Sequence, residues 1–202
     1  DTILQWIEAG SFDFERDIIL CPKSGAKEAD KPAMVKALND SIVELIGEPR
    51  GDHQKFAPGD RVMNVKNYPD IDQWNGSTGT IRSIDIDGGI WVDTDIPAID
   101  PRRTTNPDEP EYTDCVLYDK EHKKTLQHAY ALTVHKSQGS QYRRVVFVCL
   151  TRDQFMLTRS LIYTAVTRTQ AHCVVVGNQQ ALFAGIQKEN HKRTVLQELA
   201  SI

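Results

Sequence analysis

The pattern of apolar and polar positions divides the chain into three stretches of different texture. In the first, Thr2–Ala9 predicts a short helix, with Asp1 as a candidate N-cap and Gly10 after its end. Asp17–Cys21 is a short apolar run that ends before a proline, and it predicts a buried strand. Pro32–Ile46 is the clearest helix, because its apolar residues recur at helical spacing and its proline suits the first turn.

The second stretch, from Gly59 to about Leu126, consists of short β-rich runs separated by turns. The runs are Arg61–Val65, Thr80–Ile86, Ile90–Val92 and Cys115–Tyr118. Asp87–Gly89 joins two of them and predicts a hairpin, whereas four prolines predict an exposed loop over residues 97–112. Short strands at this spacing indicate a small barrel or sandwich of roughly 60 residues.

The third stretch, after Thr125, alternates strand and helix patterns. The predicted strands are Leu126–Thr133, Val145–Leu150 and Cys173–Val176, of which the last two are expected to be buried. The predicted helices are Thr158–Thr167, Asn178–Gln187 and His191–Leu199. This alternation predicts an α/β fold with a parallel sheet, which the strand at residues 17–21 joins and which helices cover. The β-rich middle is then an insert within one α/β domain.

Composition indicates an ordinary folded domain. The 202 residues are 40% apolar and 26% charged, which is enough apolar content to fill a core. No apolar run approaches the roughly 18 residues that span a bilayer, and the acidic start does not resemble a signal peptide. We therefore expect a chain that does not enter a membrane. Because it begins with Asp and not with Met, we also expect it to come from a longer protein.

The four cysteines are far apart and form no metal-binding pair. Cys21, Cys149 and Cys173 end or begin apolar runs, which predicts buried thiols in a reducing cytoplasm rather than disulfides. No histidine lies at zinc-ligand spacing from a cysteine, and no apolar strand ends in an acidic pair that could hold Mg²⁺. The sequence therefore predicts no metal site, and it also lacks the GxxxxGK[ST] phosphate loop.

Charge is distributed unevenly along the chain. Residues 1–119 carry 12 Lys and Arg against 24 Asp and Glu, whereas residues 120–202 carry 12 against 4. The overall net charge of −4 therefore hides a basic C-terminal portion. This portion is either a solvated basic face or a local site for a polyanion.

Ala129–Ser140 is the first of two segments that carry candidate chemistry. A strand pattern runs into a polar turn that contains a glycine, hydroxyls, an imidazole and an ammonium group. Ligands of open α/β sheets bind at the carboxyl ends of strands, where exposed N–H groups and hydroxyls can hold phosphate oxygens. The alternative interpretation is a capped helix start whose side chains are solvated.

Leu161–Arg168 is the second segment, a mostly apolar helix that ends in a lone arginine. Arg168 either neutralises the negative end of the helix or projects from a rigid element toward a phosphate. The two alternatives stay open on the residues alone.

Together, the sequence TVHKSQG at Thr133–Gly139 and the sequence YTAVTR at Tyr163–Arg168 resemble motifs V and VI of superfamily-one helicases. The resemblance is to the RecD-like branch, the exodeoxyribonuclease V alpha subunit and its stand-alone relatives. Ile19–Pro22, Gly59–Met63 and Val174–Asn178 also resemble segments of that branch, so that the ordered matches cover nearly the whole chain.

The resemblance implies a RecA-like parallel sheet with helices on both faces, formed by residues 1–56 and 121–202. It also implies an inserted small β-barrel of the SH3 type at residues 57–120. Such a chain is the C-terminal motor half of an ATP-dependent DNA helicase that moves 5′ to 3′ and serves DNA repair and recombination. ATP with Mg²⁺ is expected to be held mainly by the first RecA-like domain, which this chain lacks. The isolated chain is therefore expected to be inactive.

The resemblance also implies roles for single residues. Arg168 is the catalytic arginine finger, which reaches the γ-phosphate and stabilises the charge that develops in phosphoryl transfer. Nucleotide binding falls to Gln138, Gly139, Gln141 and Arg168, and nucleic-acid binding falls to Thr133, His135, Lys136 and Ser137. A solvated lysine is an equal alternative for Lys136. The family has glutamate where this chain has Gln141, whose amide bonds a ribose hydroxyl without the assistance of a charge.

Further expectations concern the aromatic and basic residues outside these motifs. In the insert, Arg61, Lys66, Tyr68 and Trp74 are candidate DNA contacts, with a structural role for Trp74 as the alternative. Tyr163 is expected to pack against its own helix rather than to stack on a base.

The expected partners are single-stranded DNA and the first RecA-like domain of the same protein, with subunits of a nuclease complex as candidates. Two other functions stay open. One is a Pif-type or RNA-directed superfamily-one helicase. The other is a nucleic-acid-binding module without motor activity.

Overall fold

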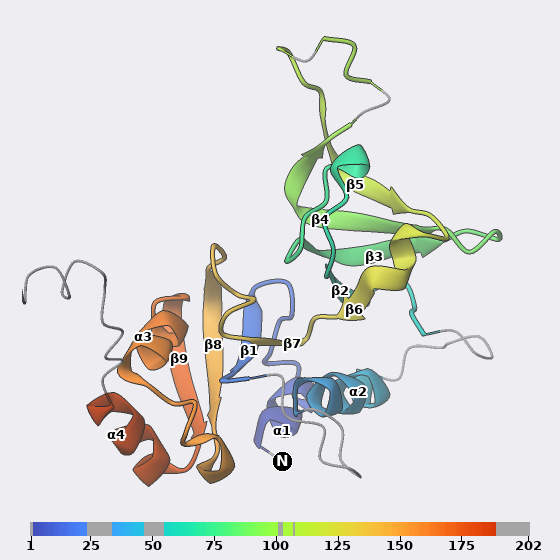
Figure 1. Ribbon diagram of the computed structural model, residues 1–202. Helices are drawn as coiled ribbons and strands as arrows, with labels where there is room; N and C mark the ends of the chain where they lie inside the picture. Colours follow the sequence, from blue (N-terminus) through green and yellow to red (C-terminus); the bar gives the residue numbers. More distant parts are fainter. Residues whose placement is uncertain (1, 24–33, 47–54, 101–102, 107, 189–202) are drawn as a thin grey trace, which may run out of the picture.

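The computed structural model describes residues 2–23, 34–46, 55–100, 103–106 and 108–188. These residues form a four-stranded parallel sheet, at the lower left of Figure 1, and a five-stranded antiparallel sheet at the upper right. The predicted α/β fold is therefore confirmed, whereas the likeness of the antiparallel sheet to an SH3 barrel stays a prediction. The predicted helix at residues 191–199 lies outside the described residues.

The parallel sheet collects strands from both ends of the chain. Its order is β7 (Ala131–Thr133), β1 (Asp17–Cys21), β8 (Tyr142–Cys149) and β9 (Thr169–Gly177). In β1, Ile19 is aligned with Ala131 on one side and with Val146 on the other. All five residues of β1 and the last five of β8 are buried, as expected for the continuous apolar runs of central parallel strands.

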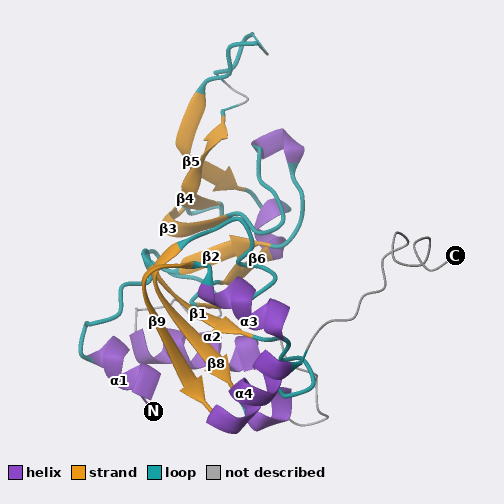
Figure 2. Cartoon of the chain, turned by 90° about the vertical axis from the view of Figure 1, so that its left-hand side faces the viewer, coloured by secondary structure: helices purple, strands orange, loops and turns teal. Residues whose placement is uncertain are grey.

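Helices cover both faces of this sheet. They are α1 (Thr2–Glu8), α2 (Met34–Ile46), α3 (Arg159–Val166) and α4 (Gln179–Gln187). α1 and α2 pack on the face of Ile19 and Val146, whereas α3 and α4 pack on the face of Ile18 and Phe147. Figure 2 shows α1 and α4 on opposite sides of β8 and β9. Within the described residues, no helix has the length and apolar character needed to cross a membrane.

Side-chain caps start α3 and α4 where the sequence predicts. The Thr158 hydroxyl accepts a hydrogen bond from the Leu161 amide at 3.2 Å, and the Asn178 side chain accepts one from the Ala181 amide at 2.8 Å. Each cap satisfies one of the N–H groups that a helix start leaves without a partner. The predicted starts of both helices are confirmed.

The antiparallel sheet has an apolar core of its own. Its order is β5 (Tyr112–Tyr118), β4 (Ile90–Ile99), β3 (Thr78–Ile84), β2 (Arg61–Asn64) and β6 (Leu126–His128). Val62, Ile81, Val92 and Tyr118 are buried in this core. β3 and β4 form the predicted hairpin, and Gly88 in its turn has a φ of +77°, a conformation that favours glycine. Within the described residues, short 3₁₀ helices lie at Pro69–Ile71, His122–Thr125 and Thr151–Asp153.

The segment that leads into β2 lies against the segment that crosses from β6 to β7. The Asp60 carboxylate accepts a hydrogen bond from the Tyr130 hydroxyl at 2.9 Å, and Nε2 of His128 lies 3.2 Å from it. The Ala129 amide donates to the Arg61 carbonyl at 2.9 Å. These bonds fasten the segment that leads into β2 to the segment that leads out of β6.

The exposed loop predicted for residues 97–112 is longer than the loop in the structure. β4 continues through Pro97 to Ile99, and β5 begins at Tyr112. The pairing of β4 with β5 is irregular between Asp93 and Ala98. Proline has no N–H group for a ladder, and it is tolerated where the pairing is interrupted in this way.

The predicted strand Leu126–Thr133 is two strands in two different sheets. β6 ends at His128, Ala129 and Tyr130 cross between the sheets, and β7 begins at Ala131. The apolar pattern does not reveal the crossing, because Ala129 and Tyr130 are buried like the strands on either side.

The predicted burial of Cys173–Val176 is wrong, because none of these four residues is buried. β9 is one of the two edge strands of the parallel sheet within the described residues, Cys173 is exposed, and 41% of Val175 is exposed. An edge strand has a neighbour on one side only, so an apolar sequence does not by itself ensure burial. Cys21 and Cys149 are buried free thiols, as predicted.

Candidate functional site

The segment after β7 forms a tight turn. The Lys136 and Ser137 amides donate to the Thr133 carbonyl at 3.0 and 3.2 Å, and the Ser137 hydroxyl donates to the Val134 carbonyl at 2.8 Å. The Thr133 hydroxyl accepts from the Lys136 amide at 3.3 Å. The predicted polar turn is confirmed, and no helix starts at this point of the described chain. Ser137 is fully buried and Thr133 nearly so, which means that both hydroxyls serve the turn itself.

The other predicted site residues of the turn lie on the surface. His135, Lys136, Gln138, Gly139 and Gln141 are exposed. Partial desolvation lowers the pKa of the Lys136 ammonium group. Gly139 has a φ of +91°, and no atom lies within 4 Å of where its β-carbon would be. The backbone conformation, and not a lack of space, therefore favours glycine there.

Arg168 lies between the end of α3 and the start of β9, beside the turn. Its Nη1 donates a hydrogen bond to the Ser140 carbonyl at 3.2 Å, and its own carbonyl accepts one from the Tyr142 amide at 2.8 Å. The guanidinium is thus turned toward the segment that follows the turn, and not toward the carbonyls at the end of α3. The structure brings together the two segments that the sequence singles out.

Nε of Arg168 is buried without a hydrogen-bond partner among the described residues. A buried donor that lacks a partner costs about 1–3 kcal/mol, and more when it is charged. Phosphate oxygens match the fork of a guanidinium, so an anionic phosphate fits this group. In contrast, the described residues contain no group of three or more His, Cys, Asp or Glu side chains that could hold a metal ion.

A hollow of about 320 Å³ lies between the turn and α3. His135 and Gln138 line it from the turn, and Thr158, Ser160 and Thr164 line it from the start and outer face of α3. The turn and α3, which ends two residues before Arg168, therefore share one concave surface, with hydroxyl, imidazole and amide groups around it.

Two aromatic side chains of this part of the molecule are exposed to solvent. The exposed fractions are 79% for Phe155 and 70% for Tyr163. The expectation that Tyr163 packs against its own helix is wrong, because Leu161, Ile162 and Ala165 occupy the buried stripe of α3. Phe155 was missed by the sequence analysis, although an aromatic residue in the polar connection between a strand and a helix is a detectable signal.

A larger groove of about 820 Å³ lies between the start of β8 and the antiparallel sheet. Gly139–Tyr142 line it on one side, and Arg61, Trp74 and Asp95 are among its residues on the other. The Arg61 guanidinium donates two hydrogen bonds to Asp95, at 2.7 and 2.6 Å, so its charge is paired within the sheet. Trp74 is 49% exposed, and its indole N–H donates to Asp72 at 3.0 Å.

Of the candidate DNA contacts predicted in the insert, some line this groove and others do not. Lys66 and Tyr68 do not line the groove, and Nζ of Lys66 lies 5.2 Å from the centre of the Tyr68 ring. Arg61 and Trp74 do line it, as does Tyr142, which the sequence analysis missed. Tyr142 gave no signal in the sequence, because it appears there only as a residue before an apolar strand.

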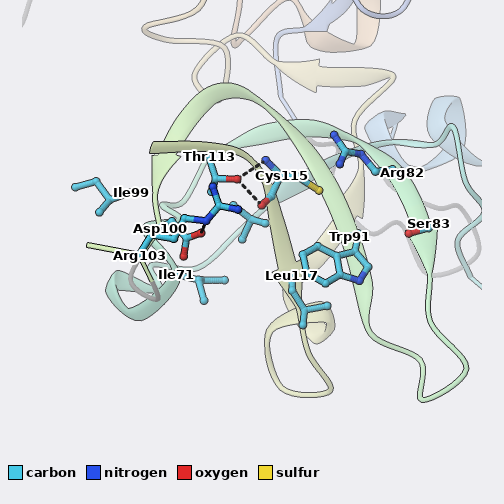
Figure 3. A pocket seen from close by; sticks show the side chains of 11 residues that line it. Ile71, Arg82, Ser83, Trp91, Ile99, Asp100, Arg103, Thr113, Cys115 and Leu117 are labelled. Carbon is cyan, nitrogen blue, oxygen red and sulfur yellow. Dashed lines mark hydrogen bonds and ion pairs between the residues drawn. The ribbon is translucent and has the colours of Figure 1, made fainter. Parts of the chain in front are cut away.

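A third hollow, of about 540 Å³, lies on the outer face of the antiparallel sheet (Figure 3). Arg82, Trp91, Arg103 and Cys115 are among its lining residues. Arg82 forms an ion pair with Asp93 at 2.6 Å, and burial raises the pKa of the Cys115 thiol. None of the predicted site residues lines this hollow, which is therefore separate from the turn and from Arg168.

Comparison with protein families gives a match over part of the chain. The family model described as UvrD-like helicase C-terminal domain matches residues 128–176. This range contains the turn, β8, α3 and nearly all of β9.

Two curated relatives match over most of the chain. The chain is 28% identical over 169 residues to the RecBCD enzyme subunit RecD of Mycolicibacterium smegmatis, which covers 83% of the chain and 27% of that protein. It is 30% identical over 144 residues to the ATP-dependent RecD2 DNA helicase of Deinococcus radiodurans, which covers 70% of the chain and 18% of that protein. The chain therefore spans less than a third of the length of these relatives.

A solved structure shares the fold. The Pif1 helicase from Bacteroides, in complex with ADP-AlF3 and ssDNA, superposes with a TM-score of 0.56 at 18% identity. The match covers 95% of this chain and 46% of that one. At this identity the likeness shows a shared fold alone.

Proposed function

Because this chain carries the C-terminal domain of a RecD-like superfamily-one helicase, we propose that it is the second motor domain of an ATP-dependent DNA helicase. A RecD-like helicase is favoured over a Pif-type helicase, since the relatives matched by sequence carry RecD names. The likeness to Pif1 is one of fold alone.

The observation that carries this proposal is the position of Arg168 beside the turn. Its guanidinium is held by the Ser140 carbonyl, and its buried Nε has no partner among the described residues. We assign Arg168 the role of the arginine finger. Closure of the two motor domains on ATP brings it to the γ-phosphate, where such fingers contribute roughly 10³–10⁵ in rate.

The exposed residues of the turn divide into two groups. Gln138, Gly139 and Gln141 are the closer in sequence to Ser140, the partner of Arg168, and we assign them to the nucleotide. His135 and Lys136 are assigned to the backbone of single-stranded DNA. With this division, one short segment contacts both the nucleotide and the single-stranded DNA.

We assign Thr133 and Ser137 to the shape of the turn, and not to contacts between their hydroxyls and single-stranded DNA. Both side chains are buried and hydrogen-bonded within the turn. Their contribution to nucleic-acid binding is therefore to fix the positions of His135 and Lys136.

The rest of the motor lies in the part of the protein that this chain does not contain. We assign ATP with Mg²⁺ chiefly to a first RecA-like domain, which is also the closing partner of this one. Single-stranded DNA is the track, and the RecBCD name of a relative supports subunits of a nuclease complex as further partners. Residues 1–56 and 121–202 are assigned to the motor domain and residues 57–120 to the inserted unit, to which β6 adds an edge strand.

The test uses the full-length protein that contains this chain, with Arg168→Ala and Arg168→Lys compared. DNA-stimulated ATP hydrolysis falls by roughly 10³-fold or more in Arg168→Ala, while binding of a fluorescent nucleotide analogue persists. Arg152→Ala, an exposed arginine in the connection after β8, is the matched control and keeps the wild-type rate. Wild-type hydrolysis by Arg168→Ala, or robust hydrolysis by these 202 residues alone, refutes the proposal.

A further inference from the structure

Tyr142, the first residue of β8, is bonded to Arg168 through the backbone. Its amide donates to the Arg168 carbonyl at 2.8 Å, and the Arg168 guanidinium donates back to the Ser140 carbonyl at 3.2 Å. The two bonds close a small ring of contacts between residues 140–142 and Arg168. A displacement of Tyr142 therefore moves the backbone and the guanidinium of Arg168 together.

The side chain of Tyr142 meets the antiparallel sheet. It packs against an apolar cluster in which Leu132 and Val145 of the parallel sheet lie together with Met63 of β2. Met63 and Arg61 are two residues apart in β2 and so lie on the same face of that strand. Arg61 lines the groove together with Tyr142. Met63 and Arg61 therefore bring this face of β2 close to Tyr142 at the start of β8.

Arg61 is fixed within the antiparallel sheet by a polar network. Besides its two hydrogen bonds to Asp95 of β4, the guanidinium donates to the Thr80 hydroxyl at 3.1 Å. The Thr78 hydroxyl donates to Asp95 at 2.5 Å. The Arg61 side chain is only 8% exposed. The network joins β2, β3 and β4 at the groove, so these strands move with Arg61 as one body.

The ring of Tyr142 is the part of the side chain that links the two sheets. It packs against the apolar cluster that contains Met63 of β2, and Tyr142 lines the groove together with Arg61 and Asp95. Burial raises the pKa of the Tyr142 hydroxyl, as expected for a side chain enclosed between the two sheets. A movement of β2 therefore reaches residues 140–142 through the packing of this ring.

We propose that Tyr142 is a positioning residue that couples the antiparallel sheet to Arg168. The position of β2, with its Arg61–Asp95 pair, relative to Tyr142 sets the orientation of the Arg168 guanidinium. The inference rests on the role in ATP hydrolysis proposed above for Arg168. It adds a path by which single-stranded DNA that pulls on the antiparallel sheet changes the rate of ATP hydrolysis.

The experiment is a double-mutant cycle in the full-length protein, with Tyr142→Ala, Asp95→Asn and the double variant. Tyr142→Phe, which keeps the ring, is measured beside the cycle and keeps the wild-type turnover number. The turnover number and the KM for ATP are measured in the presence of saturating single-stranded DNA. Each single variant of the cycle lowers the turnover number about fivefold and leaves the KM within about twofold. The double variant also loses about fivefold and not about 25-fold, because both changes break one path.

The matched control is Arg82→Gln, which breaks the Arg82–Asp93 ion pair on the outer face of the same sheet. It keeps the wild-type turnover number, and thermal unfolding of every variant checks that the fold is retained. Independent losses that multiply in the double variant, or wild-type turnover in both single variants, overturn the inference. Arg168→Ala in the same assay separates the two proposals. If Arg168→Ala abolishes hydrolysis while Tyr142→Ala and Asp95→Asn do not affect it, only the coupling fails.

Discussion

Arg168 and Ser140 are joined by a hydrogen bond of 3.2 Å from Nη1 to the carbonyl oxygen, although 28 residues separate them in the chain. The bond fastens the end of α3 to the segment between the turn and β8. Because the acceptor is a backbone carbonyl, the contact depends on the path of the chain and not on the side chain at position 140. Changes in the turn should therefore act on Arg168 through the backbone.

The first prediction concerns Gly139, whose φ of +91° disfavours side chains. Gly139→Val should lower the free energy of unfolding by about 1–2 kcal/mol and should also reduce hydrolysis by the full-length protein. Urea denaturation and an ATPase assay measure the two effects. Gly10→Val is the matched control, since Gly10 has a φ of +62° and equally open surroundings. Loss of stability without loss of hydrolysis in Gly139→Val contradicts the prediction.

The second prediction concerns the phosphate contact assigned to Lys136. Lys136→Gln should weaken binding of single-stranded DNA and reduce the slope of log affinity against log salt by about 0.7, the share of one phosphate. A fluorescence anisotropy titration at several salt concentrations gives the slope. Lys36→Gln, an exposed lysine on α2, serves as the control. If the slope is unchanged in Lys136→Gln, the prediction is contradicted and Lys136 is a solvated lysine that contacts no phosphate.

The third prediction concerns Asn39, which is buried in α2 and bonds to both backbone groups of Ala131. Its Nδ2 donates to the Ala131 carbonyl at 3.0 Å, and its Oδ1 accepts from the Ala131 amide at 2.9 Å. Asn39→Ala leaves two buried backbone groups of β7 unpaired and should cost about 2–4 kcal/mol in urea denaturation. Asn178→Ala, which removes only a helix cap, should cost about 1 kcal/mol. Equal losses in the two variants speak against the pairing role of Asn39.

The fourth prediction concerns stability in acid. Burial raises the pKa of Asp17. Its carboxylate accepts hydrogen bonds from Arg143 at 2.9 and 2.7 Å, and these bonds and its other charge contacts lower the pKa. The lowering effects outweigh burial, so the pKa lies below its ordinary value of 3.8. A depressed pKa in the folded state means that this stabilisation is present above about pH 4 and is lost as the pH falls further. Urea denaturation between pH 2 and 7 should show a smaller loss of stability in acid for Asp17→Asn than for the wild type. Asp40→Asn, at an exposed position of α2, should follow the wild type.

The elements of the parallel sheet were predictable because their patterns are local. A continuous apolar run marks β1 and β8, and a hydroxyl or amide cap marks the starts of α3 and α4. These signals reflect hydrogen bonds and burial within a few residues of the chain. The same locality explains why the hairpin at Gly88 was predicted.

The remaining features depend on contacts that no local pattern contains. The exposure of Cys173 follows from the place of β9 at the edge of the sheet, and the break between β6 and β7 follows from the crossing at Ala129. At the site, the sequence singles out the two motif segments, but it does not reveal the Arg168–Ser140 contact or the place of Tyr142 in the groove. Both arise where segments far apart in the chain meet, so only the fold reveals them.

The segment that leads into β2 and the segment that leads out of β6 lie against each other, fastened by the Asp60 carboxylate and by the bond between Ala129 and Arg61. A unit joined to its host through two adjacent strands of chain is modular: its ends can be closed by a short linker without stretching the host. Removal of the whole antiparallel sheet should therefore leave the parallel sheet able to fold. An exchange of this unit between related proteins would then leave the parallel sheet folded and would, through the coupling proposed above, change the rate of ATP hydrolysis.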